Sequence, residues 1–332
     1  NSEDKISYLF NLSMGMKHSG VRNPNSFEFD DDFNITYDTY KSVSFKDFFG
    51  DKIFNLNGGM DFLNENLRAH KPFKNIYFTG LVRDKKRQKM SKQLGNSPDP
   101  LKLISKYGAD AVRVGLMLSS SAGNDLLFDE SLCKQGKNFA NKIWNSYRLI
   151  SSWEVDEKNQ NFEKNSKIIS WYENNLNHTI NQVNKNLDNF RISDSLMLIY
   201  KLIWDDFCSW FLETIKPDYG KPISRQYLDK IKKLFLINLE LLHPFMPFIT
   251  EELWQKIKDK KEESIMVTSW PIEKKFDLKI LNHFDRAKKI ISEIRKFRKE
   301  KLIKGSTLLN LKFIGSEEKL PYSEVLKKLG NL

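Results

Sequence analysis

The segment that decides how this chain is built reads Gln88-Lys89-Met90-Ser91-Lys92-Gln93-Leu94-Gly95-Asn96-Ser97-Pro98-Asp99. Two lysines, Lys89 and Lys92, stand on either side of a serine, and Gly95 and Asn96 tolerate turn conformations that other residues resist. An ammonium group on a flexible stem is a point charge that can follow a phosphate through a reaction. The segment is therefore compatible with a phosphate-binding loop, although a plain solvated loop is the simpler interpretation of the bare spacing.

The residues around this segment predict that it joins a strand to a helix. Residues 76–79 form a short β-prone run. Asp99 and Pro100 have the residue types of a helix N-cap and a first helical position, and this helix is expected to end near Tyr107. A further helix is expected to begin at Asp110.

After about residue 132, apolar residues recur every three to four positions, which is typical of helices. The predicted helices span about 132–150, 168–187, 192–212, 227–242 and 247–257. Short connections favour a bundle of about five helices, whose aromatic stripe is most simply its core. Beyond the bundle we expect a basic helix over 281–302 and a strand over 308–314.

The net charge of +11 is unevenly distributed, because residues 1–70 carry a net charge of −4 and the remainder a net charge of +15. A basic excess of this size favours a polyanionic partner, since each neutralised phosphate releases counterions. A lysine-rich surface without such a partner explains the charge equally well. No apolar run reaches the ~18 residues that suggest a membrane span, so we expect no membrane association.

Cys133 and Cys208 are the only cysteines, and they do not form a Cys-x-x-Cys pair. Zinc sites and disulfide frameworks need more cysteines or closer spacing. We therefore expect two buried thiols, no protein-bound metal and a reducing, cytoplasmic location.

Together with its neighbours, the Lys89–Gln93 stretch resembles the KMSKS signature of class I aminoacyl-tRNA synthetases, with Gln93 in place of the final serine. Within that class the valyl subgroup is most similar, on stretches that occur in the order of that family: residues 77–84, 107–113, 122–128, 136–145 and 241–254. The resemblance extends from about Lys71 to the end of the chain.

The resemblance implies a mainly α protein, in which a helical-bundle anticodon-binding domain is preceded by the end of an α/β class I nucleotide-binding domain. It divides the chain into an unassigned segment over 1–70, the end of the catalytic domain with its loop over 71–137, the anticodon-binding bundle over 138–272, and a basic helix with the start of a C-terminal region over 273–332. It also implies a monomer whose bundle contacts the anticodon arm of a tRNA.

The same resemblance implies roles for four residues of the loop. Lys92 would contact the ATP phosphates and stabilise the transition state of amino-acid activation, and Lys89 would support it. Met90 would pack the loop, and Ser91 would help to fix its shape. The implied reactants are valine, tRNA and ATP with Mg²⁺ on the nucleotide.

A complete class I enzyme also carries a HIGH motif, which has the pattern His-x-Gly-His. None of the five histidines of this chain lies in that arrangement, and His18-Ser19-Gly20 is the nearest match. Residues 1–70 do not resemble the segment that should precede the loop, and we interpret them as a divergent remnant, an unrelated fusion or a gene fragment. Whether the chain is itself an enzyme therefore stays open.

Our main hypothesis is a valine–tRNA ligase, here as a fragment that retains the ATP-phosphate loop and the anticodon-binding domain. One alternative is a non-catalytic tRNA-binding module. Others are a fragment of an isoleucyl- or leucyl-type ligase and a bundle protein whose basic face binds a protein partner.

Overall fold

The computed structural model describes residues 28–29, 35–36, 80–119, 125–157, 166–218, 220–258, 263–304, 307–311 and 322–332. The chain divides into two units, Asn1–Ile76 and Tyr77–Leu332. In the first unit, the described residues form an antiparallel pair of strands, β1 (Glu28–Phe29) and β2 (Ile35–Thr36). The strand predicted over 76–79 lies outside the described residues.

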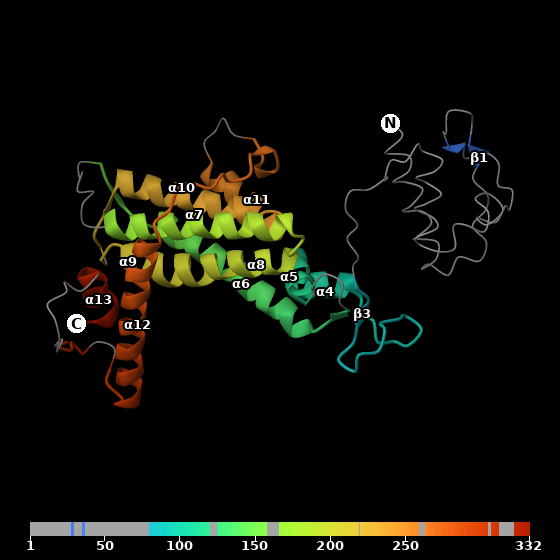
Figure 1. Cartoon of the computed structure of the whole chain (residues 1–332), viewed down its shortest axis with the longest axis horizontal. Helices are drawn as coiled ribbons and strands as arrows, with labels where there is room; N and C mark the ends of the chain where they lie inside the picture. Colours follow the sequence, from blue (N-terminus) through green and yellow to red (C-terminus); the bar gives the residue numbers. More distant parts are fainter. Residues whose placement is uncertain are drawn as a thin grey trace. The chain divides into compact units, whose positions relative to one another are not determined.

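The second unit contains a short parallel pair of strands, β3 (Val82–Arg83) and β4 (Leu126–Leu127). Between them the chain forms a loop over residues 84–99, which we call the lysine loop, and then two helices, α4 (Pro100–Tyr107) and α5 (Ala109–Ser119). After β4 the chain enters α6 (Glu130–Ser151), which leads into the bundle (Figure 1). The loop therefore leaves a strand, β3, that follows the run predicted over 76–79, and it enters a helix, α4, as predicted.

The ends of α4 follow from local sequence. The carboxylate of Asp99 accepts a hydrogen bond from the backbone N–H of Leu101 at 2.9 Å, and Pro100 occupies the first helical position. At the other end Gly108 has a φ of +93°, a conformation that residues with a Cβ atom rarely adopt. The predicted start and end of this helix are both confirmed.

The bundle occupies most of the second unit. With α6 it comprises α7 (Ser166–Asp188), α8 (Ile192–Lys201), the π-helix η2 (Leu202–Phe211), α9 (Leu212–Ile215), α10 (Arg225–Leu242) and α11 (Pro247–Ile257). Two further short strands pair in parallel, β5 (Val155–Asp156) after α6 and β6 (Ile223–Ser224) before α10. The predicted helices are thus present in the predicted order.

Aromatic side chains fill the core that the bundle shares with α12 (Leu278–Glu300). Those exposed by less than 2 % include Phe139, Trp171, Tyr172, Phe207, Phe211, Phe235 and Phe284. The rings of Tyr172 and Phe211 stack with centroids 4.7 Å apart. Aromatic pairs of this kind add about 0.5–1.5 kcal/mol beyond the burial of their area. The prediction that the aromatic stripe forms the core is confirmed.

One predicted helix is wound differently from the prediction. The periodicity predicts a continuous α-helix over 192–212, whereas η2 has hydrogen bonds to the fifth preceding residue, from the N–H of Leu212 to the carbonyl of Phe207. A wider turn places more side chains per turn against the core. Those buried in η2 are Leu202, Ile203, Asp206, Phe207, Cys208 and Phe211.

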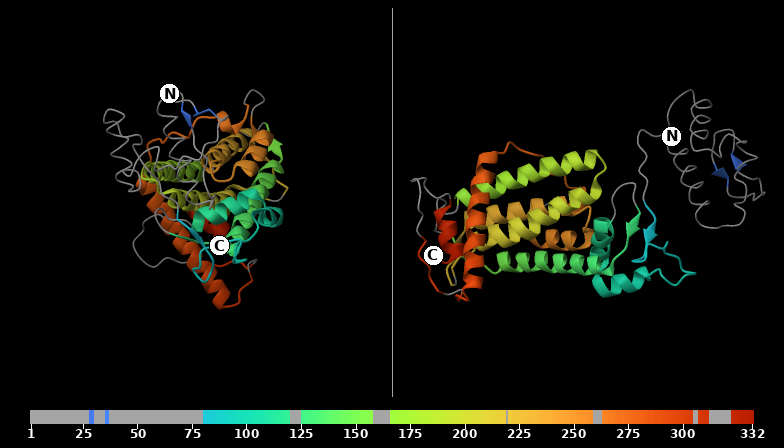
Figure 2. Two further views of the ribbon diagram at one scale, coloured as in Figure 1. Left: turned by 90° about the vertical axis from the view of Figure 1, so that its right-hand side faces the viewer. Right: turned by 60° about the horizontal axis from the view of Figure 1, so that its bottom comes forward.

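After the 3₁₀ turn η3 (Ile265–Val267), the chain forms α12 (Leu278–Glu300) and later α13 (Ser323–Gly330). In Figures 1 and 2, α12 crosses one end of the bundle, and α4 and β3 lie at the other end. Arg298 belongs to the basic cluster of α12, but it is buried and donates to the carbonyls of Gly330 at 3.1 Å and Asn331 at 2.9 Å. This arginine therefore holds the C-terminal helix in place.

The strand predicted over 308–314 is wrong for residues 308–311, which form no strand. The N–H of Leu309 instead donates to the carbonyl of Asn331 at 3.3 Å. Residues 312–314 lie outside the described part of the chain. Among the described helices, none has the length and apolarity needed to cross a membrane.

Candidate functional site

The lysine loop, residues 84–99, turns back on strand β3. The N–H of Met90 donates to the carbonyl of Val82 at 3.0 Å, and Lys89 pairs with Arg83 as an isolated antiparallel bridge. The turn between them is closed by Asp84, whose Oδ1 accepts from the backbone N–H groups of Lys86 and Gln88, each at 2.9 Å. Lys89 therefore lies directly beside the end of strand β3.

Asn96 ties the far side of the loop to this turn. Its Oδ1 accepts from the N–H of Ser91 at 2.9 Å, and its Nδ2 donates to Asp84 Oδ2 at 3.0 Å and to the carbonyl of Lys89 at 3.3 Å. The hydrogen bond from Asn96, together with that from the Gln88 N–H, holds the pKa of Asp84 below its ordinary value. A charged, bonded carboxylate thus anchors the loop at neutral pH.

Two local bonds shape the segment that follows. Ser91 Oγ accepts from the N–H of Gln93 at 3.1 Å, and the N–H of Gly95 donates to the carbonyl of Lys92 at 3.2 Å. Gly95 has a φ of +64°, as its residue type suggests. Asn96 does not have a positive φ, so its part in the loop is to bond through its side chain.

The side chains of the loop point to different environments. Met90 packs against a small apolar cluster made of Leu103, Val112, Leu126, Phe128 and Cys133. The side chains of Lys89 and Lys92 are exposed, and neither ammonium group has a hydrogen bond or ion pair with any described residue. The structure therefore brings all four predicted residues into one short loop, whose backbone is held by hydrogen bonds and in which the side chains of Lys89 and Lys92 are exposed to solvent.

Sequence reasoning named the lysines but missed the residues that hold them. Asp84 and Asn96 fix the backbone, and Arg83 forms an ion pair with Asp125, whose Oδ1 also accepts from the N–H of Leu81 at 3.1 Å. An aspartate directly after a strand, followed by polar residues, is typical of an Asx turn, so Asp84 could have been predicted. No comparable local sequence pattern predicts the hydrogen bond between Asp84 and Asn96.

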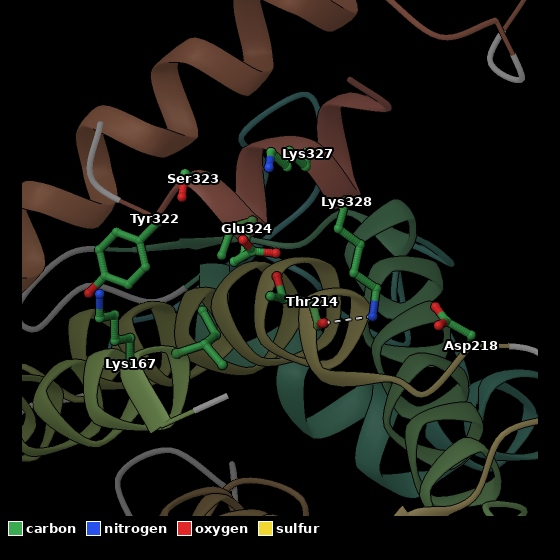
Figure 3. Close-up of a pocket in the computed structure, with 10 residues that line it drawn as sticks. Lys167, Thr214, Asp218, Tyr322, Ser323, Glu324, Lys327 and Lys328 are labelled. Atoms are coloured by element: carbon green, nitrogen blue, oxygen red, sulfur yellow. Dashed lines mark hydrogen bonds between the residues drawn. The ribbon is translucent and has the colours of Figure 1, made fainter. Parts of the chain in front are cut away.

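A separate cavity of about 420 Å³ lies between α7, the end of α9 and α13 (Figure 3). Lys328 reaches across it and donates to the carbonyls of Thr214 at 2.8 Å and Lys216 at 2.5 Å. These are carbonyls at a helix C-terminus, which attract cations. The carboxylates of Asp218 and Glu324 also line the cavity. Because its lining carries both positive and negative charges, the cavity does not favour one class of charged ligand.

Neither cysteine takes part in a site. Cys133 and Cys208 are both buried free thiols, as predicted. Burial raises the pKa of Cys208 to about 11. No cluster of three or more potential metal-ligating His, Cys, Asp or Glu side chains is found in the described part of the chain.

Comparison with known families explains the order of these elements. Residues 47–129 match the model for tRNA synthetases class I (I, L, M and V), and residues 170–313 match that for the anticodon-binding domain of tRNA ligase. The chain therefore belongs to the class I tRNA synthetases of this group. The match begins at residue 47, so the prediction that the resemblance starts near Lys71 is too late.

Within this class the chain is similar to valine–tRNA ligases. It is 49 % identical to the valine–tRNA ligase of Christiangramia forsetii over 80 % of this chain and 30 % of that protein. It is 45 % identical to that of Phocaeicola vulgatus over 98 % of this chain and 36 % of that protein. The chain thus spans about a third of the length of these relatives, and its similarity includes residues before the lysine loop.

Among solved structures, the chain resembles the LeuRS of the Agrobacterium radiobacter K84 agnB2 LeuRS-tRNA-LeuAMS ternary complex. The TM-score is 0.48 at 21 % identity, over 67 % of this chain and 27 % of that one.

Proposed function

We propose that this chain supplies a valine–tRNA ligase with its ATP-phosphate loop and its tRNA-binding bundle. The observation that carries the proposal is the lysine loop, in which an anchored backbone presents the ammonium groups of Lys89 and Lys92, which are unpaired with any described residue. The extensive identity with valine–tRNA ligases supports valine as the amino acid. The reaction would be ATP-dependent activation of valine, followed by its transfer to tRNA.

In activation, the valine carboxylate attacks the α-phosphorus of ATP and the bond to pyrophosphate breaks. Negative charge builds up on the departing pyrophosphate, and fixed positive charge nearby stabilises it. Lys92 would contact these phosphates, with Lys89 in support. Mg²⁺ would accompany the nucleotide and offset part of the charge of its phosphates.

The bundle and α12 would bind the tRNA. Three exposed lysines of α12, Lys289, Lys296 and Lys299, have no ion pair with any described residue. Cations without internal partners are available to neutralise phosphates and release counterions. Together with the match to an anticodon-binding domain, these residues favour tRNA as the partner.

A second candidate is a non-catalytic tRNA-binding module. It is favoured by one observation, which is that the 332 residues contain no His-x-Gly-His arrangement. Under this alternative the chain binds tRNA and activates no amino acid by itself.

Two measurements of ATP–pyrophosphate exchange test the proposal. The first uses the 332-residue chain alone, for which we expect no valine-dependent exchange. The second uses a chimera in which this chain replaces the matching part of the Phocaeicola vulgatus enzyme, to which it aligns over 98 % of its length. We expect valine-dependent exchange by this chimera, and a folded chimera without exchange would contradict the proposal.

Filter binding of tRNA across a salt series tests the bundle. We expect affinity to fall as salt rises, and replacing Lys289, Lys296 and Lys299 by alanine should reduce the salt slope by about one for each phosphate that is no longer neutralised. Lys102→Ala, at an exposed lysine of α4, is the matched control. Affinity that does not depend on salt would favour a protein partner instead.

A further inference from the structure

A carboxylate on helix α5 accepts hydrogen bonds from the backbone at the bend between α10 and α11. Asp110 lies in the first turn of α5 and is 7 % exposed. Its two oxygens accept from the N–H groups of Phe248 at 3.2 Å and Ile249 at 2.7 Å, in the first turn of α11. These partners are more than 130 residues away in the sequence, so this contact joins two distant parts of the second unit.

Arg113, one turn further along α5, holds the other side of the same bend. Its Nε donates to the carbonyl of Phe245 at 3.1 Å, and its Nη2 donates to the carbonyl of Pro244 at 2.9 Å. A planar guanidinium that bonds two neighbouring carbonyls fixes direction as well as distance. We call Asp110, Arg113 and residues 244–249 the α5 clasp.

The bend depends on the clasp because its own N-cap residue supplies no side-chain acceptor for the backbone N–H groups at the start of α11. Met246 stands at the N-cap of α11 and makes no side-chain capping bond. Helix N-termini leave backbone N–H groups without internal partners, and an acidic side chain there is favourable. Asp110 therefore performs from α5 the capping that Met246 cannot perform.

The same helix also touches the lysine loop. Val112 of α5 belongs to the apolar cluster against which Met90 packs. Leu103 of α4 belongs to it as well, so the helix that follows the loop is packed in the same place. Within four residues, α5 thus contacts both the loop and the bend between α10 and α11.

We propose that Asp110 and Arg113 are positioning residues that hold the α10–α11 pair in register with the lysine loop. This inference rests on the proposed function, since it concerns how tRNA on the bundle meets valine activated at the loop. A small rotation at the clasp would be magnified along the length of a tRNA. Displacement of reacting groups by about 1 Å can cost ~10²-fold in rate.

The proposal separates two steps of the reaction. Activation involves only the loop and small molecules, and the clasp variants leave it unchanged. Transfer requires the bundle-bound tRNA to reach the activated valine, so the clasp variants slow it. A purely structural role would lower the stability of the whole unit and affect both steps in parallel.

The experiment uses the chimera with Asp110→Asn and, separately, Arg113→Lys. Asp110→Asn replaces one acceptor oxygen by a donor that faces an N–H, and Arg113→Lys keeps the charge but loses the paired bonds. Valine-dependent exchange, tRNA affinity and the kcat of aminoacylation at saturating tRNA are measured for each. We expect exchange and affinity within about twofold of the parent and a loss of kcat for aminoacylation of about tenfold or more.

A control variant tests whether a loss of stability at another place in the second unit has the same effect. Lys288 of α12 pairs with Asp206 of η2 at 2.6 Å, outside the clasp, and Lys288→Met breaks this half-buried ion pair. We expect this control to lower the melting temperature without separating transfer from activation.

Three results would overturn the proposal: unchanged kcat for aminoacylation in both variants, parallel loss of exchange and aminoacylation, or the same separation of steps in Lys288→Met. If Asp110→Asn fails to fold, Arg113→Lys carries the test. Failure of the parent chimera to exchange would count against the proposed function, whereas a working parent with unaffected clasp variants would count against this inference alone.

Discussion

Asn96 Nδ2 donates a hydrogen bond to Asp84 Oδ2 at 3.0 Å, which closes the lysine loop across twelve residues. The same amide group accepts from the N–H of Ser91, between the two lysines. The hydrogen bonds of Asp84 and Asn96 thus shape the backbone that carries Lys89 and Lys92, while Met90 alone ties the loop to an apolar cluster. A loop held in this way keeps its form without burying its lysines.

Replacing Asn96 by alanine should release the loop without unfolding the protein. The variant loses the bonds to Ser91, Asp84 and Lys89, so we expect faster amide hydrogen exchange over residues 89–92. Gln93→Ala, at an exposed neighbouring side chain, should leave exchange unchanged. Equal protection in the two variants would show that Asn96 does not hold the loop.

Asp84 should remain charged to unusually low pH. Its folded pKa lies below the ordinary 3.8, so its contribution to the loop is present above the unfolded pKa and is lost as pH falls through the folded pKa. We expect the amide NMR signals of Lys86 and Gln88 to stay constant from about pH 7 to about pH 4.5. Asp84→Asn should remove any titration below that range, and a titration of these signals within it would refute the assignment.

In the chimera, Lys92→Ala should slow valine activation. Loss of one group that stabilises transition-state charge costs about 2.7–4 kcal/mol, or ~10²–10³-fold in rate. Valine-dependent exchange measures the effect, and tRNA affinity should be nearly unchanged. Lys102→Ala removes an exposed lysine from the following helix and should have no such effect. An unchanged rate in Lys92→Ala would remove this residue from the mechanism.

Helices α5 and α6 pack too closely for a side chain at Gly136. A Cβ atom there would lie 2.6 Å from the carbonyl oxygen of Ala111 and 2.8 Å from its Cα. Overpacking of this kind costs about 1–3 kcal/mol, so Gly136→Ala should lower the free energy of unfolding measured in urea.

The matched control is Asn138→Ala, at an exposed position of the same helix. It should change the free energy of unfolding by no more than about 0.5 kcal/mol. If Gly136→Ala were as stable as this control, the two helices would have room to move apart.

Helices were the most predictable part of the fold, because their signals are local. The Asp99-Pro100 start of α4 and the apolar periodicity of α7 and α10 lie within the elements that they specify. The predicted strand over 308–311 failed because alternation alone does not supply a partner strand. Leu309 bonds to Asn331 near the chain end, where no periodic pattern marks the contact.

The site was predictable only in part. The lysine pair stands out in the sequence, but its support depends on bonds between residues that are distant in the chain. Asp84 and Asn96 are twelve residues apart, and Asp110 lies more than 130 residues from its partners in α11. Chemistry-bearing side chains can be recognised from residue type and spacing, whereas the bonds that orient them arise from tertiary packing.

The winding of η2 has a consequence for how the length of this chain can vary. A helix with hydrogen bonds to the fifth preceding residue has more residues per turn than an α-helix. This segment therefore contains at least one residue more than an α-helix with the same number of turns. We expect deletion of one residue within 202–211 to be absorbed by rewinding to an α-helix. The same deletion in α10 would rotate all later side chains by about 100°. Single-residue deletions should therefore be best tolerated in the helix that holds the stacked rings of Phe207 and Phe211.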